Sequence, residues 1–177
     1  MAATQPGRRA KRQAAQQTKQ QFILLDTDIW LDYFDESRLG FQSAVDLVEF
    51  AHNAGIGLLI APTSCKDFYY QCSYAIKRDA RANGMELTAE LSMAAEEFAW
   101  GCVQSICEMA TVISMGSVDV QMSRSIHKLH RDFEDDLIVA AAMRCGVDYL
   151  VTSDKRLAAN APVPTLNAAQ ALAMLSA

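Results

Sequence analysis

The sequence predicts a three-layer α/β/α sandwich whose central sheet is mostly parallel and has four or five strands. Short apolar runs alternate along the chain with longer segments in which apolar residues recur at helical spacing. That alternation is typical of parallel βαβ units. The 177 residues are 51% hydrophobic and 21% charged, which suits one domain with a sizeable core.

The expected strands are short apolar runs, most of them followed by a turn residue or an acid. They are FILL (22–25), GLLIAP (57–62), TVISM (111–115), DYLVTSD (148–154) and VPTL (163–166). Helices are expected over 41–54, 64–78, 88–110, 118–130, 134–145 and 168–176, with Gly55 and Gly146 as stop signals. The strongly apolar helix over 88–110 is expected to be largely buried. Trp30, Phe98 and Trp100 are expected in the core or in a dimer interface.

Composition excludes several classes of protein. No apolar run approaches the roughly 18 residues that span a bilayer, and the N-terminus lacks the apolar region of a signal peptide. The five cysteines contain no C-x-x-C pair, and Cys102 and Cys107 lie inside an apolar helical pattern. We therefore expect a reduced, cytoplasmic protein with both of these thiols in the core.

The charge is unevenly distributed. Residues 1–21 hold five basic residues and no acid, so the remaining chain has 11 basic and 21 acidic residues. We interpret 1–21 as a disordered basic arm and 22–177 as the folded domain. The arm could contact phosphates, although a solvated tail is the more common role. The acidic body argues against a broad nucleic-acid-binding surface.

Acids follow several of the expected strands. Asp26 and Asp28 follow the first strand, Asp67 lies one turn into the helix after the second, and Asp154 ends the fourth. In parallel sheets, ligands bind beyond the carboxyl ends of the strands. A dense group of acids opens the helix that precedes the fourth strand: Asp132, Glu134, Asp135 and Asp136. Simple counting puts this group at the opposite edge, unless the chain crosses back over the sheet first.

Each acid also fits an ordinary structural role. DFED (132–135) and SCKD (64–67) have the form of capping boxes, and Asp154 could cap a helix that starts at Lys155. Asp32, Asp35 and Glu36 look like solvated charges at a helix end. Taken together, however, the gathered carboxylates favour a hard cation such as Mg²⁺ or Mn²⁺, which takes oxygen ligands and turns repulsion into attraction.

Four segments together resemble the PIN (PilT N-terminus) domain family. They are FILLDTDIWLDYF (22–34), LLIAPTSCKDFYY (58–70), DFEDDLIVAAAMRCGVDYLVTSDKRL (132–157) and VPTLNAAQAL (163–172). The resemblance implies strand order 3-2-1-4-5 and a metal-dependent ribonuclease, similar to the toxins of toxin–antitoxin pairs. It also implies an RNA substrate, a possible antitoxin partner, a homodimer and no membrane association.

The resemblance places the family's acidic site on individual residues. The catalytic and metal-binding residues would be Asp26, Asp67, Asp135 and Asp154, with Asp132 assisting. They would hold Mg²⁺ or Mn²⁺ for phosphodiester hydrolysis, with Asp26 and Asp135 as the principal ligands, and Thr152 or Ser153 could orient a ligand. The chain departs from the family pattern in three places: Asp67 replaces the usual Glu, Asp28 a common Asn, and Asp136 a small residue. Asp136 could simply point to solvent.

Substrate contacts are predicted from a basic stripe just ahead of the acidic group. Arg124, Lys128 and Arg131 recur at helical spacing, and they could hold a backbone phosphate. A solvated face is the more common role of such a stripe. His127 and His130 lack a further ligand that would suggest zinc.

Two other functions fit the same residues. FILLDTDIW also fits the opening of haloacid dehalogenase-like phosphatases, in which Asp26 would be the nucleophile and Asp28 the general acid/base. That family usually has Thr where this chain has Trp30. Alternatively, the domain could be a PIN-like binding scaffold that does not cut, with the acids acting as structural caps.

Overall fold

The central sheet has five parallel strands in the order β3-β2-β1-β4-β5, which confirms the predicted fold class and strand order. The structure is a computed structural model and describes residues 20–127 and 132–177. The strands are β1 (Phe22–Leu25), β2 (Gly57–Ile60), β3 (Thr111–Val112), β4 (Tyr149–Val151) and β5 (Thr165–Leu166). Each lies inside a segment that the sequence predicts as a strand. The predicted arm over 1–21 lies largely outside the described residues.

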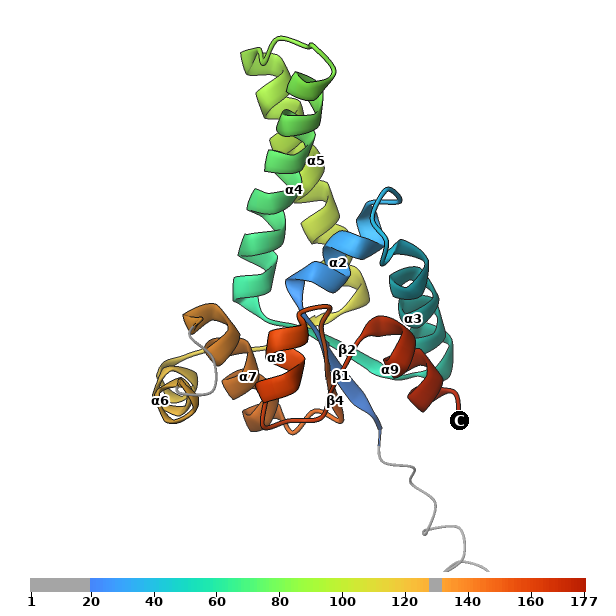
Figure 1. Ribbon diagram of the computed structural model, residues 1–177, viewed down its shortest axis with the longest axis vertical. Helices are drawn as coiled ribbons and strands as arrows, with labels where there is room; N and C mark the ends of the chain where they lie inside the picture. Colours follow the sequence, from blue (N-terminus) through green and yellow to red (C-terminus); the bar gives the residue numbers. More distant parts are fainter. Residues whose placement is uncertain (1–19, 128–131) are drawn as a thin grey trace, which may run out of the picture.

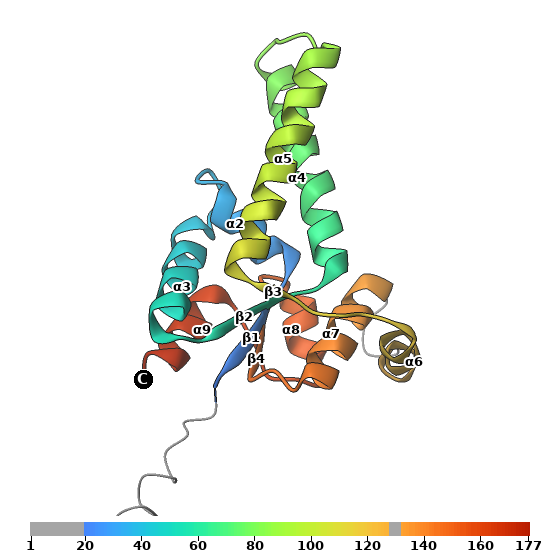
Figure 2. The ribbon, with the colours of Figure 1, turned by 180° about the vertical axis from the view of Figure 1, so that it is seen from behind.

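Helices cover both faces of the sheet (Figures 1 and 2). They are α2 (Thr27–Phe34), α3 (Phe41–Ala54), α4 (Pro62–Ala82), α5 (Ala89–Met109), α6 (Ser117–Ile126), α7 (Phe133–Cys145), α8 (Lys155–Asn160) and α9 (Ala168–Leu175). One apolar cluster joins the sheet to α2, α3, α9 and the inner ends of α4 and α5. A second cluster joins it to α6, α7 and α8. Among the described residues, no helix combines the length and the apolar character needed to cross a membrane.

Alternating side chains of the strands supply both clusters. Ile23 and Leu25 of β1 belong to the first cluster and Leu24 to the second, and all three are fully buried. Successive side chains of a strand point to opposite faces, so a strand buried on both sides is continuously apolar. Trp30, on α2, is fully buried in the first cluster, which confirms its predicted place in the core.

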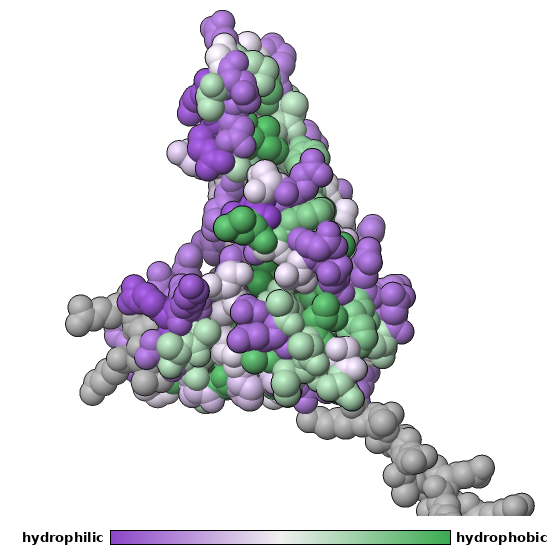
Figure 3. Space-filling model, turned by 45° about the vertical axis from the view of Figure 1, so that its right-hand side comes forward, coloured by the Kyte–Doolittle hydropathy of each residue, from purple (hydrophilic) through white to green (hydrophobic). Residues whose placement is uncertain are grey.

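α4 and α5 form an antiparallel arm that projects from the body (Figures 1 and 2). The expectation that the helix over 88–110 is largely buried is therefore wrong, because only its inner part reaches the core. Phe98 and Trp100 are 57% and 53% exposed, and Cys107 is also exposed. On the face seen in Figure 3, hydrophilic side chains cover much of the arm, with hydrophobic patches between them.

α6 carries the chain across the sheet before α7 begins. Figure 1 shows α6 nearly end-on beside α7, so α6 does not return the chain to the edge where the strands start. Arg144 of α7 holds α6 in place, since its Nε donates to the buried Asp119 at 2.7 Å. α7 therefore starts at the edge where the strands end, and Gly146, with a φ of 61°, ends it ahead of β4.

Candidate acidic active site

Six carboxylates from separate parts of the chain line one pocket beyond the carboxyl ends of the strands. They are Asp26, Asp28, Asp67, Glu134, Asp135 and Asp154. The pocket has a volume of about 270 Å³, and Arg38 is the one basic residue among its lining. All four predicted catalytic residues therefore share one pocket, at the sheet edge where ligands of parallel sheets bind.

Asp26 lies at the centre of this arrangement, between β1 and α2. It caps α2, and its Oδ1 accepts the backbone N–H of Thr27 at 2.6 Å. Its Oδ2 accepts the hydroxyl of the buried Thr152 at 2.9 Å, so Thr152 does orient this acid. Burial raises the pKa of Asp26, and the charges of Asp154 and Asp67 raise it further against the lowering effect of the two hydrogen bonds.

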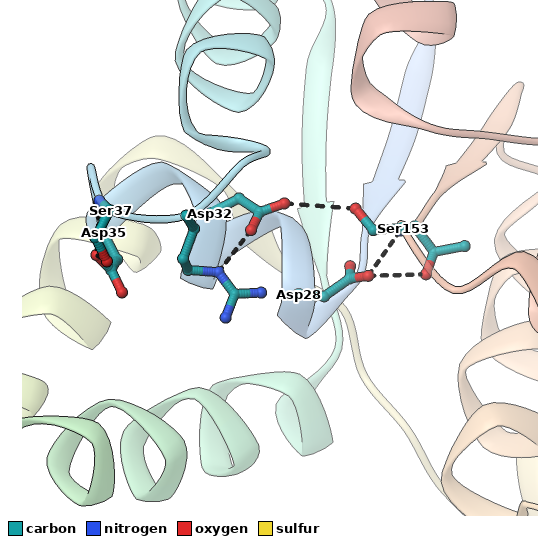
Figure 4. Close-up of polar contacts among 7 residues, drawn as sticks. Asp28, Asp32, Asp35, Ser37 and Ser153 are labelled. Carbon is teal, nitrogen blue, oxygen red and sulfur yellow. Dashed lines mark hydrogen bonds and ion pairs between the residues drawn. The ribbon is translucent and has the colours of Figure 1, made fainter. Parts of the chain in front are cut away.

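Asp28 is also held in surroundings that disfavour its charge. Its Oδ2 accepts the backbone N–H of Ser153 at 2.7 Å (Figure 4), while its Oδ1 is buried without a hydrogen-bond partner among the described residues. Burial first, and the charge of Asp26 second, raise the pKa of Asp28 to about 7. A buried carboxylate oxygen without a donor is costly, so this atom needs either a proton or a cation.

Asp32 is not the solvated charge that the sequence predicts. It is 6% exposed, and its Oδ1 accepts Arg38 Nε at 2.6 Å. Its Oδ2 accepts the hydroxyl of Ser153 at 3.4 Å, so Asp28 and Asp32, one turn apart on α2, both face the turn after β4 (Figure 4). No sequence signal marks the partnership with Arg38, because the loop between α2 and α3 brings Arg38 back.

Asp67 reaches the pocket from the second turn of α4. The helix starts at Pro62, so Ser64 lies inside it and the predicted SCKD cap is wrong. Lys66 lies 2.8 Å from Asp67 and 3.1 Å from Glu134 of α7. This exposed lysine therefore bridges the two helices on one side of the pocket.

The acids at the start of α7 point to different surroundings. Asp132 caps the helix, accepting the N–H of Glu134 at 2.9 Å, and does not line the pocket, whereas Glu134 and Asp135 do. Asp136 is fully buried, 2.8 Å from Nδ1 of His127, so the expectation that it points to solvent is wrong. The crowded acids of DFEDD therefore have separate roles: Asp132 caps the helix, Glu134 and Asp135 line the pocket, and Asp136 contacts His127.

Asp154 combines two roles as well. Its Oδ1 accepts the N–H groups of Arg156 and Leu157 at 2.6 and 3.2 Å, which confirms the predicted cap of α8, and the residue still lines the pocket. The structure does not place the residues predicted to contact phosphate in the pocket. Arg124 is exposed on α6 and is absent from the pocket lining, and Lys128 and Arg131 lie outside the described residues.

The donor set is chemically suited to a hard cation. All of the lining acids offer carboxylate oxygens, the ligands that Mg²⁺ and Mn²⁺ prefer, and the orphaned Oδ1 of Asp28 points to a missing positive charge. In residues 20–127 and 132–177, no three acidic, His or Cys side chains already converge to hold an ion directly. Water ligands would therefore complete the coordination of an ion in this pocket.

A profile of the PIN domain matches residues 22–156, which is most of the chain. The chain belongs to the PIN domain family. Members of this family are typically metal-dependent nucleases. Compared with curated protein sequences, this PIN domain has no match.

Solved structures share the fold of this PIN domain. VapBC2 from Rickettsia felis, solved bound to a DNA fragment from its promoter, is 14% identical, with a TM-score of 0.57, and covers 82% of this chain and 98% of that chain. PAE2754 from Pyrobaculum aerophilum is 16% identical, with a TM-score of 0.55 and coverages of 88% and 90%. A toxin–antitoxin complex from Klebsiella pneumoniae is 16% identical, with a TM-score of 0.53 and coverages of 82% and 97%.

Proposed function

We propose that this PIN domain is a metal-dependent endoribonuclease that hydrolyses RNA phosphodiester bonds. The observation that carries the proposal is the pocket itself, where carboxylates from four separate parts of the chain meet at the carboxyl edge of the sheet. No requirement of folding alone gathers this much negative charge, since each unit of like charge brought to a few ångströms destabilises the fold.

Some of these side chains would bind the metal ion, and others hold those ligands in position. Asp26 and Asp135 would be the principal ligands of Mg²⁺ or Mn²⁺, with Asp154 and Asp67 completing the shell directly or through water. The ion would supply a polarised water and stabilise charge on the phosphate. Thr152 fixes the rotamer of Asp26 through its hydroxyl, and Lys66 keeps Asp67 and Glu134 in place across the mouth.

We further propose that the protein is the toxin of a toxin–antitoxin pair, acting as a homodimer in the cytoplasm. Two observations support the toxin assignment. Family membership covers most of the chain, and one structure of similar fold was solved as a toxin–antitoxin complex. Co-purification with the product of an adjacent gene tests the antitoxin, and light scattering tests the dimer.

Cleavage of end-labelled single-stranded RNA tests the nuclease. Purified protein would be assayed in Mn²⁺, Mg²⁺ and EDTA, beside Asp26→Asn, Asp135→Asn and the matched control Asp46→Asn, an exposed acid of α3. Metal-dependent cutting should fall roughly a hundredfold or more in the two site variants and stay unchanged in the control. Equal cutting by all variants would contradict the proposal, provided that thermal melts show each one folded.

A scaffold that binds without cutting is the second candidate, because Asp26, Asp132 and Asp154 all cap helices. If the acids serve only as caps, Mn²⁺ will neither bind in calorimetry nor raise the melting temperature. The phosphatase alternative has less support, because the match to the PIN domain spans most of the chain and the observed strand order is the one that the family implies.

A further inference from the structure

A second and larger hollow adjoins the acidic pocket. We call it the α8–α9 groove: it lies between the loop Ser37–Gly40, the turn Thr152–Asp154, α8 and the first turn of α9, and its volume is about 1160 Å³. It shares Arg38 and Asp154 with the acidic pocket, so the two hollows are neighbours. A site for one small molecule is usually about 300–1,000 Å³, so this groove suits an extended ligand.

The acidic pocket is open to an extended ligand on the side that faces the α8–α9 groove. On the opposite side, Lys66 bridges Asp67 and Glu134 between α4 and α7. On the groove side, the floor is made of small side chains, including Ala158, Ala159, Ala168 and Ala169. A chain whose phosphate lies in the acidic pocket would pass the Arg38–Asp32 ion pair as it continues into the groove.

Lys155 lines the groove and Arg156, the next residue, lies just outside its lining, both in positions that helix stability does not explain. Lys155 and Arg156 are the first two residues of α8, both are exposed, and neither forms an ion pair with any residue that the structure describes. Basic residues in the first turn oppose the helix dipole. Their placement directly after Asp154 is instead what binding of backbone phosphates requires.

Several other polar groups of the groove are already engaged. Arg38 donates its Nε to Asp32, and Asn167 and Gln170 satisfy each other's backbone N–H groups at 2.9 and 3.0 Å. Contacts to an anionic ligand therefore fall to the α8 cations and to the remaining N–H groups of Arg38, rather than to the N-terminus of α9.

Resting on the proposed nuclease function, we propose that the α8–α9 groove binds the single-stranded RNA that flanks the scissile bond, with Lys155 and Arg156 on its phosphates and the alanine floor beneath its bases. The groove then sets affinity for RNA, while the acidic pocket performs the hydrolysis. Small phosphodiesters need only the pocket.

The test compares a long and a short substrate. Lys155→Glu/Arg156→Glu would be measured on single-stranded RNA and on bis(p-nitrophenyl) phosphate, a diester too small to reach the groove. The control Arg78→Glu/Arg81→Glu makes the same change of charge on the outer half of α4. We expect kcat/KM for RNA to fall about tenfold or more through KM in the groove variant, with the small diester and the control within about twofold. The slope of log affinity against log salt should drop by about 0.7 for each lost contact.

A neutral variant separates contact from general electrostatics. Ala159→Trp fills the groove without changing charge, and it should also weaken RNA cleavage. A loss in the charge reversal alone, with Ala159→Trp unchanged, would overturn the groove as the RNA path. An unchanged KM in both would overturn it too, and would leave the groove to a protein partner.

Failure of the nuclease proposal can be distinguished from failure of the groove proposal. If wild type hydrolyses neither substrate, fluorescence anisotropy of labelled RNA decides the groove alone. A dissociation constant raised about tenfold by both groove variants supports RNA binding there, and an unchanged constant excludes it.

Discussion

Asp28 is a residue whose surroundings disfavour its own charge. Its pKa of about 7 and its orphaned Oδ1 both arise from burial beside Asp26. A family member with Asn at this position has a neutral amide in place of the carboxylate. The extra carboxylate in this chain therefore makes the metal-free site less stable and makes binding of a cation more favourable.

Replacing Asp28 by Asn should consequently stabilise the metal-free protein near pH 8. Removing a buried charge worth roughly 1–2 kcal/mol should raise the melting temperature by a few degrees. Metal-dependent RNA cleavage should persist within about tenfold, since Asp26 retains both hydrogen bonds. Loss of all turnover would instead favour the phosphatase chemistry, in which Asp28 is the general acid/base. Differential scanning fluorimetry in EDTA and the RNA assay measure the two effects.

At the scale of elements, the two tryptophans show how burial decides the role of one residue type. Trp30, on α2, is fully buried, whereas Trp100, on α5, is 53% exposed. Trp100 meets Tyr69 edge-on with the ring centroids 6.4 Å apart, a spacing typical of such pairs. Their replacement by Ala tests this difference.

Trp30→Ala should lower the free energy of unfolding by about 3–5 kcal/mol, because it leaves a cavity in the core. Trp100→Ala should cost under about 1.5 kcal/mol. Urea unfolding followed by circular dichroism gives both values. Equal losses would contradict the difference in burial between Trp30 and Trp100.

The arm formed by α4 and α5 has a register that thiol chemistry can check. Lys77 pairs with Glu96 at 2.6 Å, which aligns the two helices antiparallel. The same register sets Cys65 beside Cys107 and Cys72 beside Cys102, and the thiols of each pair interact.

Diamide, which accepts the two electrons and two protons of each thiol pair, should therefore close Cys65–Cys107 and Cys72–Cys102 and leave Cys145 reduced. Burial raises the pKa of Cys65 and of Cys72 to about 11, so the reaction should be slow at neutral pH and faster as pH rises. Non-reducing peptide mapping reads the pairing, and Cys72→Ser should remove one bridge only. Any other pairing would contradict the register.

At the scale of the whole molecule, stability should depend on pH in opposite ways without and with metal. Burial raises the pKa of Asp26 and Asp28 above the unfolded value of 3.8, to about 7 for Asp28. The folded state then binds more protons than the unfolded state between these values, so their contribution to stability is greatest below about pH 4 and is lost as pH rises toward 7.

Bound Mn²⁺ should reverse this trend, because a cation binds the deprotonated carboxylates. We expect Mn²⁺ to raise the melting temperature more at pH 8 than at pH 5, and Asp26→Asn to abolish the difference. Melting curves across this range in EDTA and in Mn²⁺ make the comparison. An equal effect of Mn²⁺ at both pH values would exclude the acidic pocket as its site.

The sequence by itself determined the layered α/β/α class, the places of all five strands and the glycine stops of α3 and α7. These features depend on local apolar periodicity and on the backbone freedom of glycine, and both can be read from residues that are close together in the sequence. It also showed acids at strand ends and helix starts, and the resemblance to the PIN family singled out Asp26, Asp67, Asp135 and Asp154 among them.

Only the tertiary structure decided where those acids point. The crossing of α6 brings Asp135 to the edge where the strands end, the loop after α2 returns Arg38 to Asp32, and packing buries Asp136 beside His127. The projection of α5 from the body left Phe98 and Trp100 exposed, although their spacing is that of a core helix. Side-chain direction and burial depend on contacts between distant segments, and no local pattern encodes which segments will meet.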